Sequence, residues 1–270
     1  MSYAQQSPPM GSGSRTGTTA IRTFEFGKTH VVRPKGKHQA TIVWLHGLGD
    51  NGLSSSQLLE SLRLPNIKWI CPTAPIRPVK TLGGFPCTAW FDMGEVSSSS
   101  SSSENGGNGD EDWEGLDASA SHIANLLSTE PPHVKVGIGG FSMGGAVALY
   151  SATCYAISTY SNGMPYPLSN LNALLALSSW LPPRNNININ IHPNNNNYKT
   201  RASSFPIFIA HGIADDVVLY KYGHQSAHSL YSAGFRYITF KSYEGIGHYT
   251  IPREMEELVN WLASNLGLEG

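Results

Sequence analysis

The chain has 270 residues and a mass of 29.2 kDa, and 40% of its residues are hydrophobic, a composition ordinary for one globular domain. Lys and Arg number 18 against 19 Asp and Glu, so there is no cationic excess and we expect no nucleic-acid partner. Three cysteines without a C-x-x-C pair indicate a reducing compartment, and the sequence has no apolar leader and no 18-residue apolar run. We therefore expect a cytoplasmic protein.

The chain begins with a compositionally biased segment. Residues 1–20 are mostly Ser, Gly, Pro, Gln and Thr, which bury too little surface to offset the entropy of ordering, so we expect a disordered tail. Residues 21–270 then form a single domain. A Ser-rich stretch at 97–112 and an Asn-rich stretch at 185–197 interrupt it, and we expect both to be surface insertions in loops.

Apolar runs and apolar periodicity predict the ordered elements. The alternating segment Thr23–Val32 predicts an antiparallel edge hairpin. Near-continuous apolar runs predict buried strands at Thr41–His46, Ile67–Cys71, Val134–Gly139, Ala173–Leu177, Ile207–Ala210 and Tyr237–Phe240. Helical periodicity predicts helices at Gln57–Leu62, Leu116–Leu127, Gly144–Ile157, Tyr220–Ala233 and Arg253–Leu266. This alternation predicts right-handed crossovers and an α/β fold with a mostly parallel central sheet and helices on both faces.

The strand Val134–Gly139 leads into a G-x-S-x-G motif at Gly140–Gly144 and then into an apolar helix. This is the context of a nucleophile elbow, where glycines two residues before and two after the serine let backbones pack closely around a strained turn. The pattern therefore predicts Ser142 as a catalytic nucleophile. A dinucleotide-binding fingerprint would need glycine at position 142, where the serine stands.

A serine hydroxyl needs a base to take its proton and a third group to orient that base. His248 lies in a glycine-rich loop after the strand Tyr237–Phe240. Asp215 and Asp216 follow the strand Ile207–Ala210. The order Ser, Asp, His along the chain is that of an α/β-hydrolase sheet, so we expect His248 to be the base and an aspartate of this pair to orient it.

The tetrahedral oxyanion of such a reaction needs hydrogen-bond donors, which in this fold are backbone N–H groups. One belongs to the residue after the nucleophile, Met143, where the N-terminus of a helix adds a positive dipole. The other lies in the loop Leu45–Asp50, whose glycines let the chain turn and direct the N–H of Leu48 inward. No H-E-x-x-H motif or paired Cys/His spacing occurs, so we expect no metal and no cofactor.

With these motifs in place, the chain resembles the acyl-protein thioesterase family, also described as the lysophospholipase/carboxylesterase group of small α/β-hydrolases, and in particular its plant members. The matching segments, in the family's order, are Leu45–Asp50, Trp69–Pro75, Trp90–Asp92, Gly139–Gly145, Trp180–Pro182, His211–Gly212 with Asp215, and Tyr243–Gly245 with His248. The resemblance implies Ser142, Asp215 and His248 as the triad. It also implies Leu48 and Met143 as oxyanion donors and a hydrophobic channel for a fatty acyl chain.

Apolar residues also gather near strand ends, where a globular protein normally has polar side chains. The residues that we consider for acyl binding are Leu53, Phe85, Trp90, Phe91, Trp180 and Leu181, together with Leu48. As a set they predict a channel mouth or a membrane-facing patch. The alternative is a satellite core beneath long loops.

Taken with the resemblance, the sequence predicts a serine hydrolase that cleaves acyl thioesters or esters through an acyl-enzyme intermediate. S-acylated proteins are the leading substrates, which implies a depalmitoylating enzyme with transient contact to a membrane surface. A lysophospholipase, a short-chain carboxylesterase and a deacetylase are the alternatives within the hydrolases. From a different class, a hydrolase-like receptor would retain the triad and bind a ligand without turnover.

Overall fold

The computed structural model describes residues 22–93, 111–182 and 196–268. The predicted tail at 1–20 lies outside the described residues, as do most of the predicted insertions at 97–112 and 185–197. Within the three described ranges, no helix is both long enough and apolar enough to cross a membrane.

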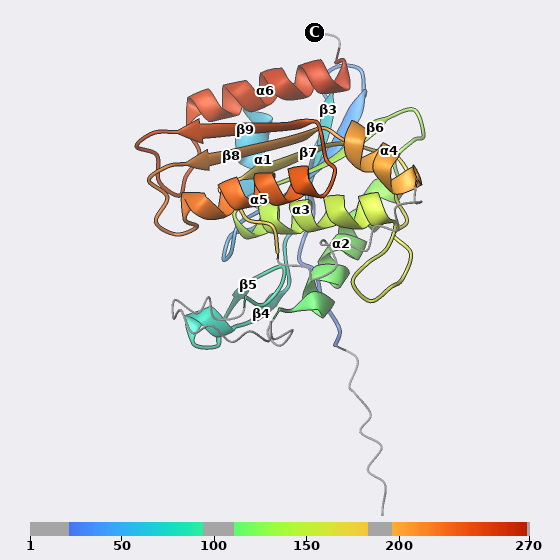
Figure 1. Ribbon diagram of the computed structural model, residues 1–270. Helices are drawn as coiled ribbons and strands as arrows, with labels where there is room; N and C mark the ends of the chain where they lie inside the picture. The colour runs from blue at the N-terminus through green and yellow to red at the C-terminus, as the bar shows by residue number, and fades with distance from the viewer. Residues whose placement is uncertain (1–21, 94–110, 183–195, 269–270) are drawn as a thin grey trace, which may run out of the picture.

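A seven-stranded sheet forms the centre of the molecule (Figure 1), in the order β1-β3-β2-β6-β7-β8-β9. The strands are β1 (His30–Val32), β2 (Ala40–Leu45), β3 (Ile67–Cys71), β6 (Lys135–Phe141), β7 (Leu171–Leu177), β8 (Ile207–Gly212) and β9 (Ile238–Tyr243). The edge strand β1 pairs with β3 in antiparallel orientation, and the other neighbours pair in parallel. The predicted parallel α/β sheet is therefore confirmed, and each parallel strand delivers the chain to the same carboxyl edge.

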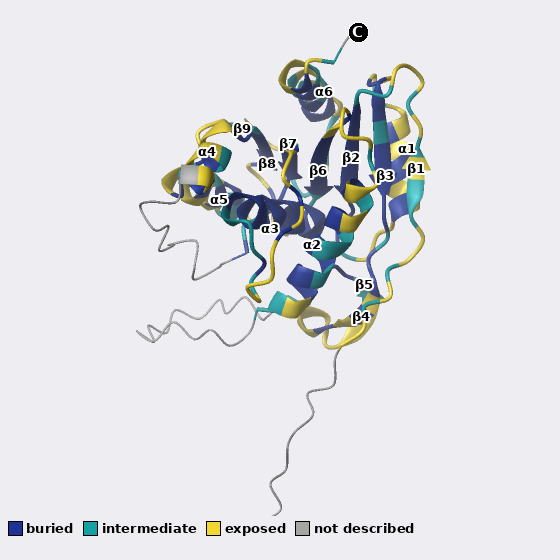
Figure 2. Cartoon of the chain, turned by 90° about the vertical axis from the view of Figure 1, so that its right-hand side faces the viewer, coloured by how far each residue is buried: buried dark blue, intermediate teal, exposed yellow. Residues whose placement is uncertain are grey.

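Helices cover both faces of this sheet. They are α1 (Gly52–Glu60), α2 (Trp113–Ser128), α3 (Met143–Ile157), α4 (Asn196–Ser204), α5 (Tyr220–Ser232) and α6 (Pro252–Leu266). One apolar core joins α1 and α6 to one face, and a larger core joins α2, α3 and α4 to the other. Figure 2 shows the central strands and α3 as mostly buried. Because α3 is buried on all sides, the serine that precedes it is held against the middle of the sheet.

Two of the predicted elements differ from the structure by more than three residues at one end. The first helix begins at Gly52, not at Gln57, because the Asn51 side chain caps it by accepting a hydrogen bond from the Ser54 N–H at 3.0 Å. The predicted edge hairpin Thr23–Val32 is wrong, since only His30–Val32 forms a strand. The residues before it follow another path, where the Gly27 N–H donates to the Thr73 carbonyl and Phe26 stacks on His122.

A two-stranded hairpin lies apart from the sheet, formed by β4 (Ile76–Val79) and β5 (Phe85–Thr88) with the short 3₁₀ helix η1 (Lys80–Leu82) between them. The Arg77 guanidinium reaches across to the Asp112 carboxylate at 2.5 Å, and this ion pair is buried. Asp112 also caps α2 by accepting from the Gly115 N–H. The end of the predicted Ser-rich insertion therefore belongs to the ordered domain, as does the end of the Asn-rich one, where residues 196–197 start α4.

Candidate active site

Ser142 lies at the sharp turn between β6 and α3, with φ 54° and ψ −122°. A non-glycine residue rarely adopts a positive φ, so this backbone is strained in the way that a nucleophile elbow requires. A β-carbon added to Gly140 would overlap with the Gly144 backbone, and one added to Gly144 would overlap with the Leu45 carbonyl oxygen. The predicted need for glycine on both sides of the serine is thus confirmed by the packing.

The turn presents the Ser142 hydroxyl to an imidazole. The Ser142 Oγ lies 2.9 Å from His248 Nε2, and His248 Nδ1 lies 2.8 Å from Asp215 Oδ2. The carboxylate can only accept, so Nδ1 carries the ring hydrogen and Nε2 is free to accept from the hydroxyl. Strands β6, β8 and β9 thus bring together three residues that lie up to 106 positions apart in the chain.

Asp215 is fixed by its own loop. Its second oxygen, Oδ1, accepts from the backbone N–H groups of Val217 and Val218 at 3.0 and 2.9 Å. Asp215 is only 3% exposed, whereas its neighbour Asp216 is on the surface. Of the two adjacent carboxylates that the sequence left open, the structure brings Asp215 to the imidazole.

The loop after β2 lies directly beside the nucleophile, since a β-carbon on Gly47 would lie 3.5 Å from the Ser142 β-carbon. The His46 side chain holds this loop in place through two hydrogen bonds. Its Nδ1 lies 2.6 Å from the Gly47 carbonyl oxygen, and its Nε2 accepts from the Ala74 N–H at 3.0 Å. Since a carbonyl accepts and an N–H donates, the ring is neutral with its hydrogen on Nδ1, and burial lowers the pKa of His46.

The two predicted oxyanion donors occupy different environments. Met143 is fully buried at the first position of α3, where backbone N–H groups have no partner within the helix. Leu48 is half-buried and packs against the larger core in the loop after Gly47. Ser179 contacts the turn that carries the nucleophile, because its hydroxyl donates to the Ser142 carbonyl at 2.9 Å. The site therefore combines a hydroxyl nucleophile, a neutral imidazole, a buried carboxylate and a helix N-terminus.

The apolar residues predicted to bind an acyl chain do not form one surface. Trp90 and Phe91 are fully buried, and the Trp90 indole N–H donates to the His46 carbonyl at 2.8 Å. Trp180 and Leu181 are half-buried, with the Trp180 ring set edge-on to Phe91 at 6.2 Å between centroids. Leu53 on α1 and Phe85 on β5 are exposed, at 48% and 67%. A membrane-facing patch is therefore wrong for Trp90 and Phe91, which belong to the larger core, whereas acyl binding by these residues stays a prediction.

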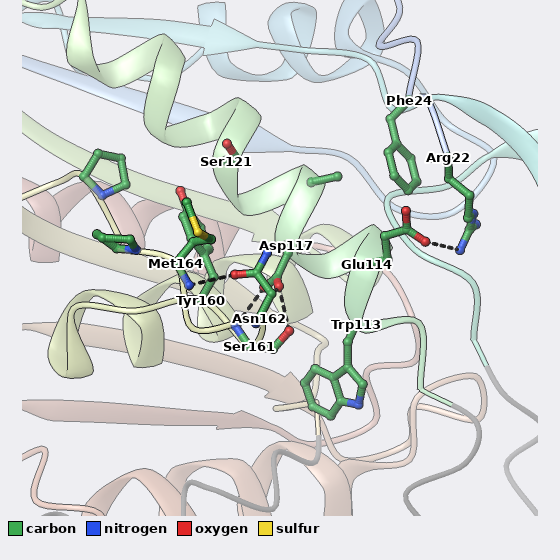
Figure 3. A pocket seen from close by; sticks show the side chains of 13 residues that line it. Arg22, Phe24, Trp113, Glu114, Asp117, Ser121, Tyr160, Ser161, Asn162 and Met164 are labelled. Atoms are coloured by element: carbon green, nitrogen blue, oxygen red, sulfur yellow. Dashed lines mark hydrogen bonds and ion pairs between the residues drawn. The ribbon is translucent and has the colours of Figure 1, made fainter. Parts of the chain in front are cut away.

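A hollow of about 910 Å³ lies elsewhere, over the first turns of α2 and the loop after α3 (Figure 3). It is lined by Arg22, Phe24, Trp113, Glu114, Asp117, Ala118, Ser121, Tyr160, Ser161, Asn162, Met164, Pro165 and Pro167. The Asp117 carboxylate accepts hydrogen bonds from the Tyr150 hydroxyl and from Ser161 and Asn162, so it anchors the loop to the helix. None of the predicted catalytic or acyl-binding residues lines this hollow.

In the part of the chain that the structure describes, no three His, Cys, Asp or Glu side chains lie close enough together to hold a metal ion. The groups that converge at the elbow are those of nucleophilic acyl transfer.

Residues 27–266 match the phospholipase/carboxylesterase family. The chain belongs to this family. It is therefore an ester or thioester hydrolase, and its sheet is that of an α/β-hydrolase. Among solved structures, acyl-protein thioesterase 2 of Zea mays is 58% identical, with a TM-score of 0.83 over 89% of this chain and 100% of that one.

Curated relatives of this hydrolase match most of the chain and carry two kinds of name. Acyl-protein thioesterase 1 of Cryptococcus neoformans is 31% identical, over 87% of this chain and 96% of its own length. A probable carboxylesterase of Oryza sativa is 30% identical, over 85% of this chain and 79% of its own length. The predicted resemblance to the acyl-protein thioesterase group and its plant members is confirmed.

Sequence reasoning missed the residues that position the site. His46, Ser179 and His211 make hydrogen bonds to backbone carbonyls beside the elbow or the aspartate loop. A signal was present for two of them, because a His-Gly pair directly follows β2 at His46 and forms the end of β8 at His211.

Proposed function

We propose that Ser142, His248 and Asp215 form a catalytic triad that hydrolyses acyl thioesters through an acyl-enzyme. His248 Nε2 takes the Ser142 proton as Oγ attacks the carbonyl carbon of the substrate. The imidazolium then gives that proton to the leaving thiolate or alkoxide. Water repeats the sequence on the acyl-enzyme and releases the fatty acid. The observation that carries this proposal is the hydrogen-bonded chain from Ser142 through His248 to Asp215.

We propose that the backbone N–H groups of Met143 and Leu48 donate hydrogen bonds to the oxyanion. The first turn of α3 brings a positive dipole to the nucleophile, and Gly47 brings the second loop to the same point. Each such donor supplies about 3 kcal/mol of transition-state stabilisation in comparable sites. Because both donors are backbone groups, the methionine side chain at position 143 does not limit the chemistry.

For the substrate, we propose the acyl chains of S-acylated proteins, so that the enzyme depalmitoylates them. This rests on the names of the relatives from Zea mays and Cryptococcus neoformans. The carboxylesterase name of the Oryza sativa relative supports a second candidate, an enzyme for short oxygen esters. Lysophospholipids and acetylated amines or proteins remain alternatives of the same chemistry.

A matched substrate series tests this assignment. Initial rates would be measured for acetyl, octanoyl and palmitoyl thioesters and for the corresponding oxygen esters, together with a palmitoylated peptide. The proposal expects the thioesters with long chains to have the highest kcat/KM. Highest activity on acetyl oxygen esters would instead support the short-chain enzyme. No turnover of any ester, with binding retained, would support a receptor.

We further propose that the enzyme acts in the cytoplasm with transient contact to a membrane surface. The three cysteines Cys71, Cys87 and Cys154 are free thiols, which suits a reducing compartment. Phe85 and Leu82 in the hairpin region and Leu53 on α1 supply exposed apolar side chains for such contact. Co-sedimentation with vesicles of phosphatidylcholine, comparing the native chain with Phe85→Ser, measures this contact.

A further inference from the structure

A second buried histidine lies beside the proposed triad. His211, near the end of β8, has no solvent exposure, and its Nε2 lies 2.7 Å from the Val218 carbonyl oxygen. A carbonyl only accepts, so Nε2 carries the ring hydrogen. The other nitrogen, Nδ1, has no hydrogen-bond partner among the described residues and packs against Gly223 of α5, where an added β-carbon would overlap with it. The ring is therefore neutral, with no donor on its buried Nδ1 side.

Val218 connects this ring to the aspartate. Its carbonyl accepts from His211, and its N–H donates to Asp215 Oδ1 at 2.9 Å. The loop that carries Asp215 thus folds back on itself and is tied to β8 through one imidazole. Residues 211 and 215 also meet directly, since His211 Nε2 lies 3.4 Å from Asp215 Oδ2.

That same carboxylate oxygen is the acceptor for His248. Asp215 Oδ2 lies 2.8 Å from His248 Nδ1, so two imidazoles face one oxygen at unequal distances. The titratable groups around His211 are Asp215, His248 and the Tyr220 side chain of α5, whose ring is edge-on at 6.0 Å. Burial lowers the pKa of His211, which favours its neutral form. Because His211 is neutral, the negative charge of Asp215 is available to stabilise the imidazolium that forms on His248 during the reaction.

We propose that His211 is a positioning residue for the aspartate of the triad. Its Nε2–H holds the Val218 carbonyl, and the loop then presents Asp215 Oδ2 to His248 at hydrogen-bonding distance. This inference rests on the proposed function of Ser142, Asp215 and His248. His211 itself does not touch the substrate, because its ring is closed in by the loop and by Gly223.

The test compares two replacements of the ring. His211→Phe keeps an aromatic ring but removes the donor, whereas His211→Gln keeps an N–H that can reach the Val218 carbonyl. We expect His211→Phe to lower kcat by about 100-fold with a small change in KM, because it lets the carboxylate move by a fraction of an ångström to an ångström. His211→Gln should recover most of that loss. The acid limb of the kcat/KM profile should shift to lower pH in His211→Phe, since a displaced carboxylate stabilises the His248 imidazolium less.

His122→Phe is the matched control, because burial also lowers the pKa of His122, which is half-buried but lies on α2 against Phe26. It should leave kcat and the pH profile unchanged. Circular dichroism and the melting temperature of each variant show whether it folds. If His211→Phe does not fold, His211→Asn replaces it, because this shorter amide cannot reach the Val218 carbonyl and should lose kcat where Gln does not.

Two results would overturn the inference. One is native kcat and an unchanged acid limb in His211→Phe or His211→Asn. The other is an equal loss of kcat in His211→Gln and in His211→Phe or His211→Asn, with the pH profile unchanged in each. A purely structural role of His211 predicts this second result. Failure of the proposed function itself would look different, because the native chain would then neither turn over esters nor label at Ser142 with a fluorophosphonate.

Discussion

The loops that carry Ser142, Asp215 and His248 differ from the hairpin β4–β5 in how their side chains are held. Each of the three side chains has hydrogen-bond partners within 3.0 Å, and the elbow is closed by backbone contacts that admit only glycine. The hairpin is anchored by the buried Arg77–Asp112 ion pair and by Thr88, whose carbonyl accepts from the Gly49 N–H, while Ile76 and Phe85 on its strands are mostly exposed. The site geometry is therefore set by the sheet edge, and we expect the exposed side chains of the hairpin to tolerate change without altering that geometry.

The strongest test of this difference removes the central groups at the sheet edge. We expect Ser142→Ala and His248→Ala each to lower kcat by about 10⁴- to 10⁶-fold, with little further loss in the double variant, because the two groups act as one unit. Chromogenic ester hydrolysis measures the rates. Tyr249→Phe, at an exposed side chain next to His248, is the control and should retain native activity. Substantial turnover in either alanine variant would remove the triad assignment.

The two adjacent aspartates offer a matched pair. Asp215→Asn should lower kcat by about 10⁴-fold, because an amide can donate to His248 Nδ1 and so favours the tautomer that cannot accept from Ser142. Asp216→Asn should remain within a few-fold of the native rate, since that side chain is exposed. Steady-state kinetics of both variants decide between them. The opposite ranking would mean that the loop rearranges on substrate binding to present Asp216.

The sequence pattern was sufficient for Ser142, for His248 and for the aspartate pair at 215 and 216, because each signal was local. A glycine-flanked serine between a strand and a helix, followed by aspartate and histidine after later strands, specifies the positions through the parallel sheet alone. The central strands were also predictable, since strands buried on both faces are continuously apolar. The hydrogen bond from His211 to Val218 was not predictable, because its acceptor is a backbone carbonyl and the spacing of side chains in the sequence does not reveal such a partner.

The hairpin was missed for a different physical reason. Pro78 and Pro86 argue against strands, and the segment has little apolar alternation. A tertiary contact stabilises the hairpin: Arg77 forms an ion pair with Asp112, which lies 35 residues later in the chain, at the end of the Ser-rich stretch. Helix α4 is a similar case, since its Asn-rich start has poor helix propensity and its Tyr198 hydroxyl donates to the Ala233 carbonyl after α5.

A third prediction concerns a buried acid, Glu254, just after the His248 loop. Burial raises the pKa of Glu254 to about 7, the Glu257 charge adds to this, and the Ile251 N–H acts against it. The folded state therefore binds this proton more tightly than the unfolded state does. Its stability falls as pH rises from about 4.5 through about 7, by about 3 kcal/mol at pH 8.

Glu254→Gln should remove this penalty. We expect a higher melting temperature than the native chain at pH 8 and no gain at pH 4, where the native carboxyl is already protonated. Glu256→Gln, at an exposed position two residues later, is the control and should show no such pH dependence. An equal gain at both pH values would show that burial of charge is not the cause.

The smallest expected effect concerns the apolar residues predicted to bind the acyl chain. Variants of Phe85 in the hairpin and of Trp180 beside Phe91 separate the contributions of these two regions. If a channel holds the acyl chain, each buried methylene contributes up to about 0.8 kcal/mol, so kcat/KM should rise a few-fold per carbon until the channel is full. Trp180→Ala, which removes a half-buried ring packed against Phe91, should flatten this rise while sparing acetyl esters. Phe85→Ser should leave the rise intact for soluble substrates, because that ring is exposed. A native preference for acetyl over octanoyl esters would contradict the channel and favour a short-chain esterase or a deacetylase.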